Sequence, residues 1–110
     1  RLTAVGVGWM ILALLGCGKD PQTLVEKAQA LAKEGKAADA EIEFRNALSI
    51  EPNRKEAKFG LAQALEAQGK ITEAWDSYEE IERTNPNDKA VLEARLRLGY
   101  TALRYGRSRM

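Results

Sequence analysis

The fold is decided by the stretch Gly35-Lys-Ala-Ala-Asp-Ala40-Glu-Ile-Glu-Phe44-Arg-Asn-Ala47-Leu48-Ser-Ile-Glu-Pro52. It returns 34 residues later as Gly69-Lys-Ile-Thr-Glu-Ala74-Trp-Asp-Ser-Tyr78-Glu-Glu-Ile81-Glu-Arg-Thr-Asn-Pro86. A fixed period of this length, with glycine, small, aromatic and proline residues at matched positions, is typical of stacked helix pairs. The sequence therefore predicts an all-α solenoid of antiparallel helix pairs.

The composition narrows the classes of function. Of the 110 residues 30% are charged, yet the net charge is only +1, which argues against a nucleic-acid binder. The chain has no histidine, the commonest general base and metal ligand. The single cysteine, Cys17, excludes an internal disulfide and a multi-cysteine metal site. We therefore expect no catalysis, no cofactor, no metal and no small-molecule substrate.

The first helix pair has clear start and stop signals. Asp20 followed by Pro21 is a preferred helix opening, and Gly35 stands where a left-handed residue closes a helix. The second helix of the pair ends before Pro52, because the residue preceding a proline is disfavoured in the helical conformation. For the next pair, Asn53 and Glu56 have the spacing of a capping box at its first helix.

These features together resemble the tetratricopeptide repeat, which implies a right-handed solenoid. The matching residues that define the repeats are Gly35, Ala40, Phe44, Pro52, Gly69, Ala74, Tyr78 and Pro86. The resemblance gives one complete repeat at 24–54, a second at 55–88 and the first helix of a third at 89–110. A generic helical bundle is the alternative.

The last segment departs from the period. Residues 90–105 predict one more helix, and Gly106 resembles the terminal glycine of a first helix, although it lies 37 residues after Gly69. We attribute the extra three residues to a longer helix. Apolar residues occupy two of its faces and only one face can pack on the second repeat, so we expect the other to be exposed and to favour self-association.

The start of the chain has the features of an export signal. An uncharged, apolar run follows Arg1 and ends in Leu14-Leu15-Gly16-Cys17, which resembles the bacterial lipobox. That resemblance makes 1–17 a signal peptide, Cys17 the residue that receives the lipid, and 18–23 a tether. An uncleaved membrane helix and an ordinary cleaved signal are the alternatives. The absence of an initiating Met indicates a truncated start.

A curved stack of first helices makes a concave surface, where repeat proteins bind their partners. By repeat phase and the three-residue offset, nine residues line this surface: Val25, Gln29, Lys33, Phe59, Gln63, Glu66, Leu96, Tyr100 and Arg104. An apolar strip beside amide and phenol groups suits an extended or helical peptide. The family's carboxylate clamp uses Lys and Asn where this chain has Val25 and Gln29, so that form of recognition is not expected.

The function that the sequence favours is a lipid-anchored scaffold that binds a protein partner in the bacterial cell envelope. A lipobox followed by such repeats resembles lipoproteins of pilus biogenesis and outer-membrane protein assembly. It also resembles the repeat lipoproteins of exopolysaccharide and PEP-CTERM sorting systems, towards which the stretch Phe44-Arg-Asn-Ala-Leu48 points faintly. We expect it to face the periplasm, at the outer rather than the inner membrane in a Gram-negative cell. The alternative is the repeat region of a larger envelope enzyme whose catalytic domain lies beyond Met110.

Overall fold

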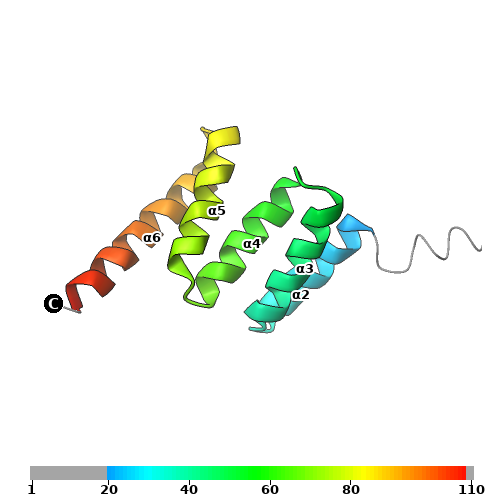
Figure 1. Ribbon diagram of the computed structural model, residues 1–110, viewed down its shortest axis with the longest axis horizontal. Coiled ribbons are helices and arrows are strands. Elements are labelled where there is room, and N and C mark those ends of the chain that lie inside the picture. Colours follow the sequence, from blue (N-terminus) through cyan, green and yellow to red (C-terminus); the bar gives the residue numbers. More distant parts are fainter. Residues whose placement is uncertain (1–19, 109–110) are drawn as a thin grey trace, which may run out of the picture.

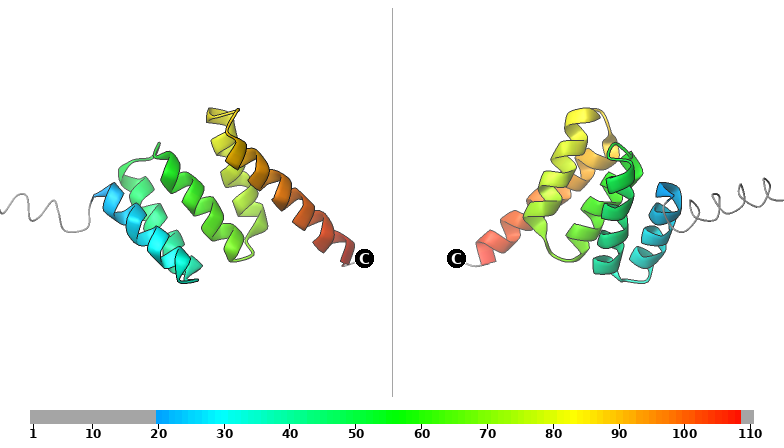
Figure 2. Two further views of the ribbon diagram at one scale, coloured as in Figure 1. Left: turned by 180° about the vertical axis from the view of Figure 1, so that it is seen from behind. Right: turned by 45° about the vertical axis from the view of Figure 1, so that its right-hand side comes forward.

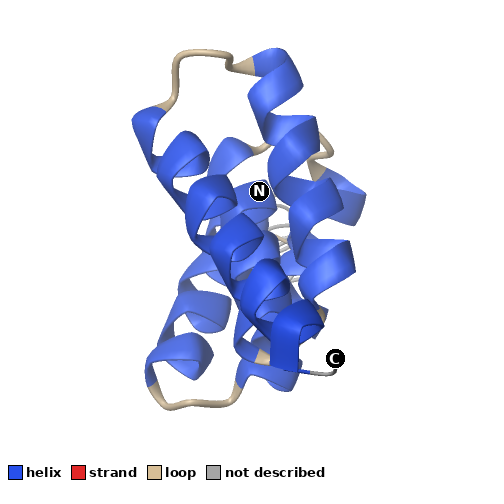
Figure 3. Ribbon diagram, turned by 90° about the vertical axis from the view of Figure 1, so that its left-hand side faces the viewer, coloured by secondary structure: helices blue, strands red, loops and turns tan. Residues whose placement is uncertain are grey.

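The computed structural model describes residues 20–108, which form α-helices joined by short loops (Figures 1 and 3). The helices are α2 (Pro21–Lys33), α3 (Ala37–Ile50), α4 (Lys55–Ala67), α5 (Ile71–Thr84) and α6 (Lys89–Ser108). No strand occurs within these residues. The chain is therefore an all-α stack of two helix pairs, α2–α3 and α4–α5, followed by the single helix α6.

Both helix pairs turn at a glycine in the left-handed conformation. Gly35 and Gly69 have φ angles of 81° and 80°, as the sequence predicts. A side chain at either position would meet no atom within 4 Å, so the backbone conformation alone selects glycine. At the start of α2 the side chain of Asp20 accepts a hydrogen bond from the Thr23 N–H at 3.3 Å, which confirms the predicted cap.

The first helices, α2, α4 and α6, follow one side of the stack, with α3 and α5 behind them in the left view of Figure 2. Each helix packs on its neighbours along the chain, and α2 also contacts α4. The small residues Ala28, Ala40, Ala62 and Ala74 are completely buried, as expected where two helices approach closely. Tyr78 and Ile81 are among the largest fully buried side chains of the core.

The junction between the two pairs depends on a glycine inside a helix. A Cβ atom added to Gly60 of α4 would lie 2.2 Å from Cζ of Phe44 on α3. Phe44 is itself buried, with 2% of its surface exposed, so moving its ring aside would disturb the packing of the core around it. The absence of a side chain at Gly60 therefore allows α3 and α4 to pack closely enough to join the repeats.

The predicted capping box at the start of α4 is wrong. The N-cap residue is Arg54, and no side chain accepts a hydrogen bond there. The carboxylate of Glu56 lies 3.7 Å from the Arg54 guanidinium instead of reaching back to Asn53. Arg54 also donates hydrogen bonds to Glu51 in the same loop and to Gln22 of α2, so the contacts of its guanidinium hold this turn in place.

The predicted end of the last helix and its three-residue offset are also wrong. Helix α6 runs through Gly106 to Ser108. Its buried residues Val91, Ala94 and Leu98 lie 34 positions after Ala57, Gly60 and Ala64, which are the corresponding buried residues of α4. The period is therefore strict, and Leu103 stands where Gly35 and Gly69 close their helices. Because leucine disfavours the left-handed conformation, α6 continues past that point.

The Gly60 contact predicts opposite effects for two glycine-to-alanine substitutions in helices. Gly60→Ala gains about 1 kcal/mol of helix propensity but overpacks the Phe44 contact by about 1–3 kcal/mol, so we expect a net loss of stability. Gly99→Ala is the matched control, since its Cβ would make only an ordinary contact, 3.6 Å from Trp75. This control should stabilise the protein by about 1 kcal/mol. Urea unfolding measures both, and a Gly60→Ala variant as stable as wild type would contradict the contact.

Candidate functional site

A groove with a volume of about 920 Å³ lies between the two first helices, α2 and α4. Its walls carry Gln29, Ala32 and Lys33 of α2 and Phe59, Gln63 and Ala67 of α4. Phe44 and Gly60, the pair that joins the repeats, also line it. The groove therefore exists because the close contact at Gly60 sets the distance between successive first helices.

Phe59 provides the main apolar surface of this groove. It is partly buried, and its ring meets that of Tyr78 edge to face with the centroids 5.6 Å apart. Such a contact fixes the orientation of an aromatic side chain, so that Phe59 is held in place before a ligand arrives.

Polar groups border the apolar surface. Gln29 and Gln63 are exposed and occupy the same phase of α2 and α4. Lys33 is exposed in the last turn of α2, and Glu56 lies in the first turn of α4. Amides can donate to and accept from a peptide backbone, while an ammonium group attracts a carboxylate. The groove thus has the chemistry to bind an extended peptide with an apolar side chain.

Comparison with known proteins identifies the architecture. A family model described as tetratricopeptide repeat matches residues 31–98, which is more than half of the chain. The chain belongs to the tetratricopeptide repeat family. No curated protein matches it. Tetratricopeptide repeats serve as protein–protein interaction modules, so the partner expected for this chain is a protein.

Four of the nine residues predicted for the concave surface of this tetratricopeptide repeat protein lie together in the groove: Gln29, Lys33, Phe59 and Gln63. Val25 does not, because it is buried in the core with 2% of its surface exposed. Its apolar side chain serves packing, as an aliphatic residue at a helix interface commonly does.

Glu66 is occupied by contacts within the repeat stack. Its carboxylate accepts two hydrogen bonds of 2.9 Å from the Arg97 guanidinium of α6 and one of 3.1 Å from the Tyr78 hydroxyl. The bond from Arg97 is the main cause of the lowered pKa of Glu66, while burial raises the pKa of Tyr78. Arg97, which the sequence analysis missed, follows Gln63 by 34 residues and could have been found from the strict period.

The three predicted residues of α6 do not reach the groove. Leu96 and Tyr100 line a separate surface with Trp75 of α5, and Arg104 is exposed near the end of the helix. The error follows from the three-residue offset: in strict phase Leu96 corresponds to Ala62, and Glu93 corresponds to Phe59. Cys17 and the predicted signal lie outside the described residues. Among residues 20–108 no helix is both long and apolar enough to span a bilayer.

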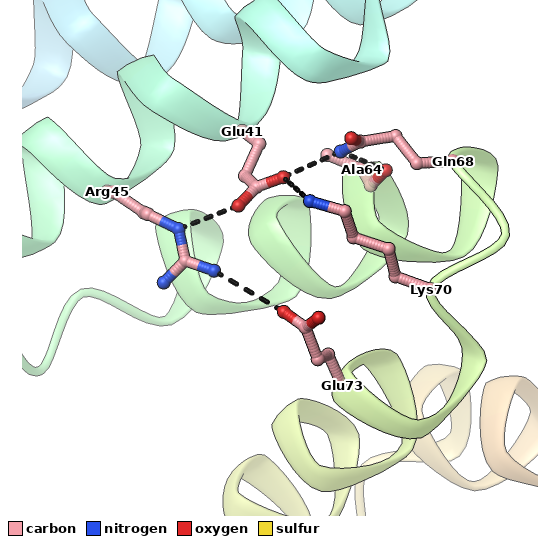
Figure 4. Close-up of polar contacts among 6 residues, drawn as sticks. All are labelled: Glu41, Arg45, Ala64, Gln68, Lys70 and Glu73. Atoms are coloured by element: carbon pink, nitrogen blue, oxygen red, sulfur yellow. Dashed lines mark hydrogen bonds and ion pairs between the residues drawn. The ribbon is translucent and has the colours of Figure 1, made fainter.

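A cluster of polar and charged side chains around Glu41 joins the two repeats. Glu41 of α3 accepts hydrogen bonds from Arg45 at 2.8 Å, from Gln68 at 2.7 Å and from Lys70 at 3.2 Å (Figure 4). Gln68 and Lys70 precede α5, so this carboxylate ties the first repeat to the second. Because its hydrogen bonds cross from α3 to the turn before α5, the cluster contributes to the stacking of the repeats. The described residues hold no group of three or more side chains suited to a metal ion.

These contacts give Glu41 a pH-dependent role. The Gln68 hydrogen bond, aided by Arg45 and Lys70, lowers the pKa of Glu41 from 4.5 to about 2. Because the folded state favours the ionised form, its contribution to stability is complete above about pH 4.5 and is lost as the pH falls towards 2. Between about pH 6 and pH 2.5, wild type should lose about 1 kcal/mol more stability than Glu41→Gln, a size typical of partly exposed ion pairs.

Denaturant unfolding at a series of pH values measures this difference. Glu43 and Glu66, whose pKa values are also lowered, remain in both proteins, so the comparison isolates Glu41. Parallel stability curves for wild type and variant would show that Glu41 does not hold the two repeats together.

Proposed function

We propose that the chain is a scaffold that binds an extended peptide segment of a partner protein in the groove between α2 and α4. The groove with Phe59 at its centre and Gln29, Lys33 and Gln63 at its edge carries the proposal. The peptide would place an apolar side chain against Phe59 and hydrogen-bond its backbone to the two amides. An acidic side chain or terminus would lie beside Lys33.

The proposal predicts which peptides bind. A displayed library of short random peptides, selected on the protein, should yield sequences with an apolar residue a few positions from Asp or Glu. Fluorescence anisotropy then gives the dissociation constant of a selected peptide. Lys33→Glu should raise that constant about tenfold, which corresponds to 1.4 kcal/mol. Phe59→Ala should raise it more, since truncation of an aromatic anchor commonly costs about 2 kcal/mol.

Two further variants keep this test sharp. Gln63 is exposed, so Gln63→Ala should not disturb the core. Weaker peptide binding by this variant would therefore reflect a lost contact with the peptide and not a loss of folding. Tyr100→Ala is the control, because Tyr100 lies on another surface and should leave the constant unchanged. If the groove variants fold and bind the peptide as well as wild type does, the groove is not the site. A loss of binding in Tyr100→Ala would place the site on the α6 surface instead.

We further propose that the scaffold is anchored in the cell envelope by a lipid on Cys17, facing the periplasm. The support is the sequence Leu14-Leu15-Gly16-Cys17 after an uncharged run. Two or three acyl chains on one residue hold a soluble domain firmly, because each buried methylene adds about 0.8 kcal/mol. The resemblance of the sequence to repeat lipoproteins of exopolysaccharide and PEP-CTERM sorting systems supports this location, and Gly18 after the cysteine favours the outer membrane.

Metabolic labelling with palmitate tests the anchor in a bacterium that processes lipoproteins. Wild type should be labelled and should fractionate with membranes, and Cys17→Ser should remove the label because it removes the acceptor thiol. The matched control is Ser49→Cys in the Cys17→Ser background, which restores one exposed thiol at another place. Labelling of Cys17→Ser would exclude lipidation at this residue.

A further inference from the structure

A second hollow, of about 770 Å³, lies one repeat further along the stack, between α4 and α6. We call it the α4–α6 hollow. Six of its lining residues follow residues of the α2–α4 groove by 34 positions: Glu66, Ala67, Gly69, Ile71, Leu98 and Thr101. The α2–α4 groove stays open although α5 follows α4 and packs on it. A helix after α6 would pack in the same way and would leave the α4–α6 hollow open.

An ion pair spans the interval between α4 and α6 and confines the hollow to one end of it. Arg97 of α6 donates two hydrogen bonds of 2.9 Å to Glu66 of α4, and the Tyr78 hydroxyl donates a third, of 3.1 Å, to the same carboxylate. Arg97 corresponds to Gln63, which lines the α2–α4 groove, yet Arg97 does not line the α4–α6 hollow. The hollow therefore lies at the end of the interval near the turn at Gly69.

The lining of the α4–α6 hollow suits an uncharged side chain. Ile71 is partly buried against the core and provides apolar surface, and the small residues Ala67 and Ala102 are exposed beside it. Glu66 is the only charged residue among the described residues that line the hollow, and its carboxylate is already paired with Arg97. A cationic side chain would have to displace Arg97, and an anionic one would be repelled by Glu66. The hollow therefore favours an aliphatic side chain.

Ala67 connects the α4–α6 hollow with the α2–α4 groove, because it lines both. It is small and exposed, so a bound chain can pass over it. Lys33 lies at the same end of the α2–α4 groove, in the last turn of α2. A peptide with an apolar side chain on Phe59 and an acidic side chain beside Lys33 therefore reaches the α4–α6 hollow next.

We propose that the α4–α6 hollow is a second subsite for the peptide bound in the α2–α4 groove, and that it takes one aliphatic side chain of that peptide. This inference rests on the proposed function. It gives the peptide three determinants in a fixed order: an apolar residue at Phe59, an acidic residue at Lys33 and an aliphatic residue at Ile71. An extended chain advances by about 3.3 Å per residue, so the order of the contacts is also the order in the sequence of the peptide. The acidic residue thus lies between two apolar ones.

A substitution in the hollow tests the subsite, with all variants in the Cys17→Ser background. On wild type, replacing the aliphatic residue of a selected peptide by alanine should raise the dissociation constant about tenfold, because buried methylene groups are lost. Ala102→Gln places a longer, uncharged side chain at the hollow. With this variant the same change in the peptide should alter the constant by less than about twofold, since the contact is already lost. Ala38→Gln is the matched control, because Ala38 is an exposed alanine of α3 that lines neither hollow nor groove.

Nuclear magnetic resonance of labelled isoleucine methyl groups tests the location without a substitution in the hollow. The Cδ1 methyl resonance of Ile71 should shift when the whole peptide binds. It should stay in place with a peptide cut after its acidic residue, because that peptide ends before the hollow. Ile42 is the internal control, since it is exposed by 56% on α3, away from the peptide, and should shift with neither.

Two results would overturn the second subsite while leaving the α2–α4 groove as a binding site. One is an equal effect of the alanine change in the peptide on wild type and on Ala102→Gln. The other is an Ile71 methyl resonance that does not respond to the whole peptide. The proposed function fails on a different result, a selected peptide whose affinity depends on neither Phe59 nor Lys33, and the second subsite would then fail with it.

Discussion

The contact between the Phe44 ring and the bare backbone of Gly60 is the constraint on which the arrangement of the repeats depends. It joins α3 to α4, which are the adjoining helices of the first and second repeats. The same two residues line the groove between α2 and α4. The stacking of the repeats and the shape of the groove therefore share one cause: the distance at which α3 and α4 can pack when Gly60 has no side chain.

Most of the fold could be predicted from residues that are required by the local backbone conformation at their own positions. Gly35 and Gly69 end their helices in the left-handed conformation, and Asp20 caps the helix that begins at the next residue. Each of these signals depends only on neighbouring residues. Gly60 was not predicted, because a glycine within a helical pattern normally indicates only a weak position. Its role becomes visible when the ring of Phe44, distant in sequence, is placed over it.

In the candidate site, too, some features could be predicted from the sequence and others depend on residues distant in the sequence. Gln29, Lys33 and Gln63 could be predicted because residues one period apart point the same way in a repeat protein. Glu66 belongs to a similar surface by sequence, but its carboxylate binds Arg97, 31 residues further along the chain. Sequence periodicity gives the direction in which a side chain points. It cannot tell whether a partner from another helix has already engaged that side chain.

The two charged residues of the groove lie at its opposite ends, Lys33 in the last turn of α2 and Glu56 in the first turn of α4. The carboxylate of Glu56 is partly neutralised by Arg54 at 3.7 Å, so the field along the groove comes mainly from the ammonium group. A peptide with one acidic end would feel a different potential in each of its two orientations. For the peptide ligand that we propose, the groove would therefore distinguish the N-to-C direction of the bound chain, and a sequence and its reversal would bind as different ligands.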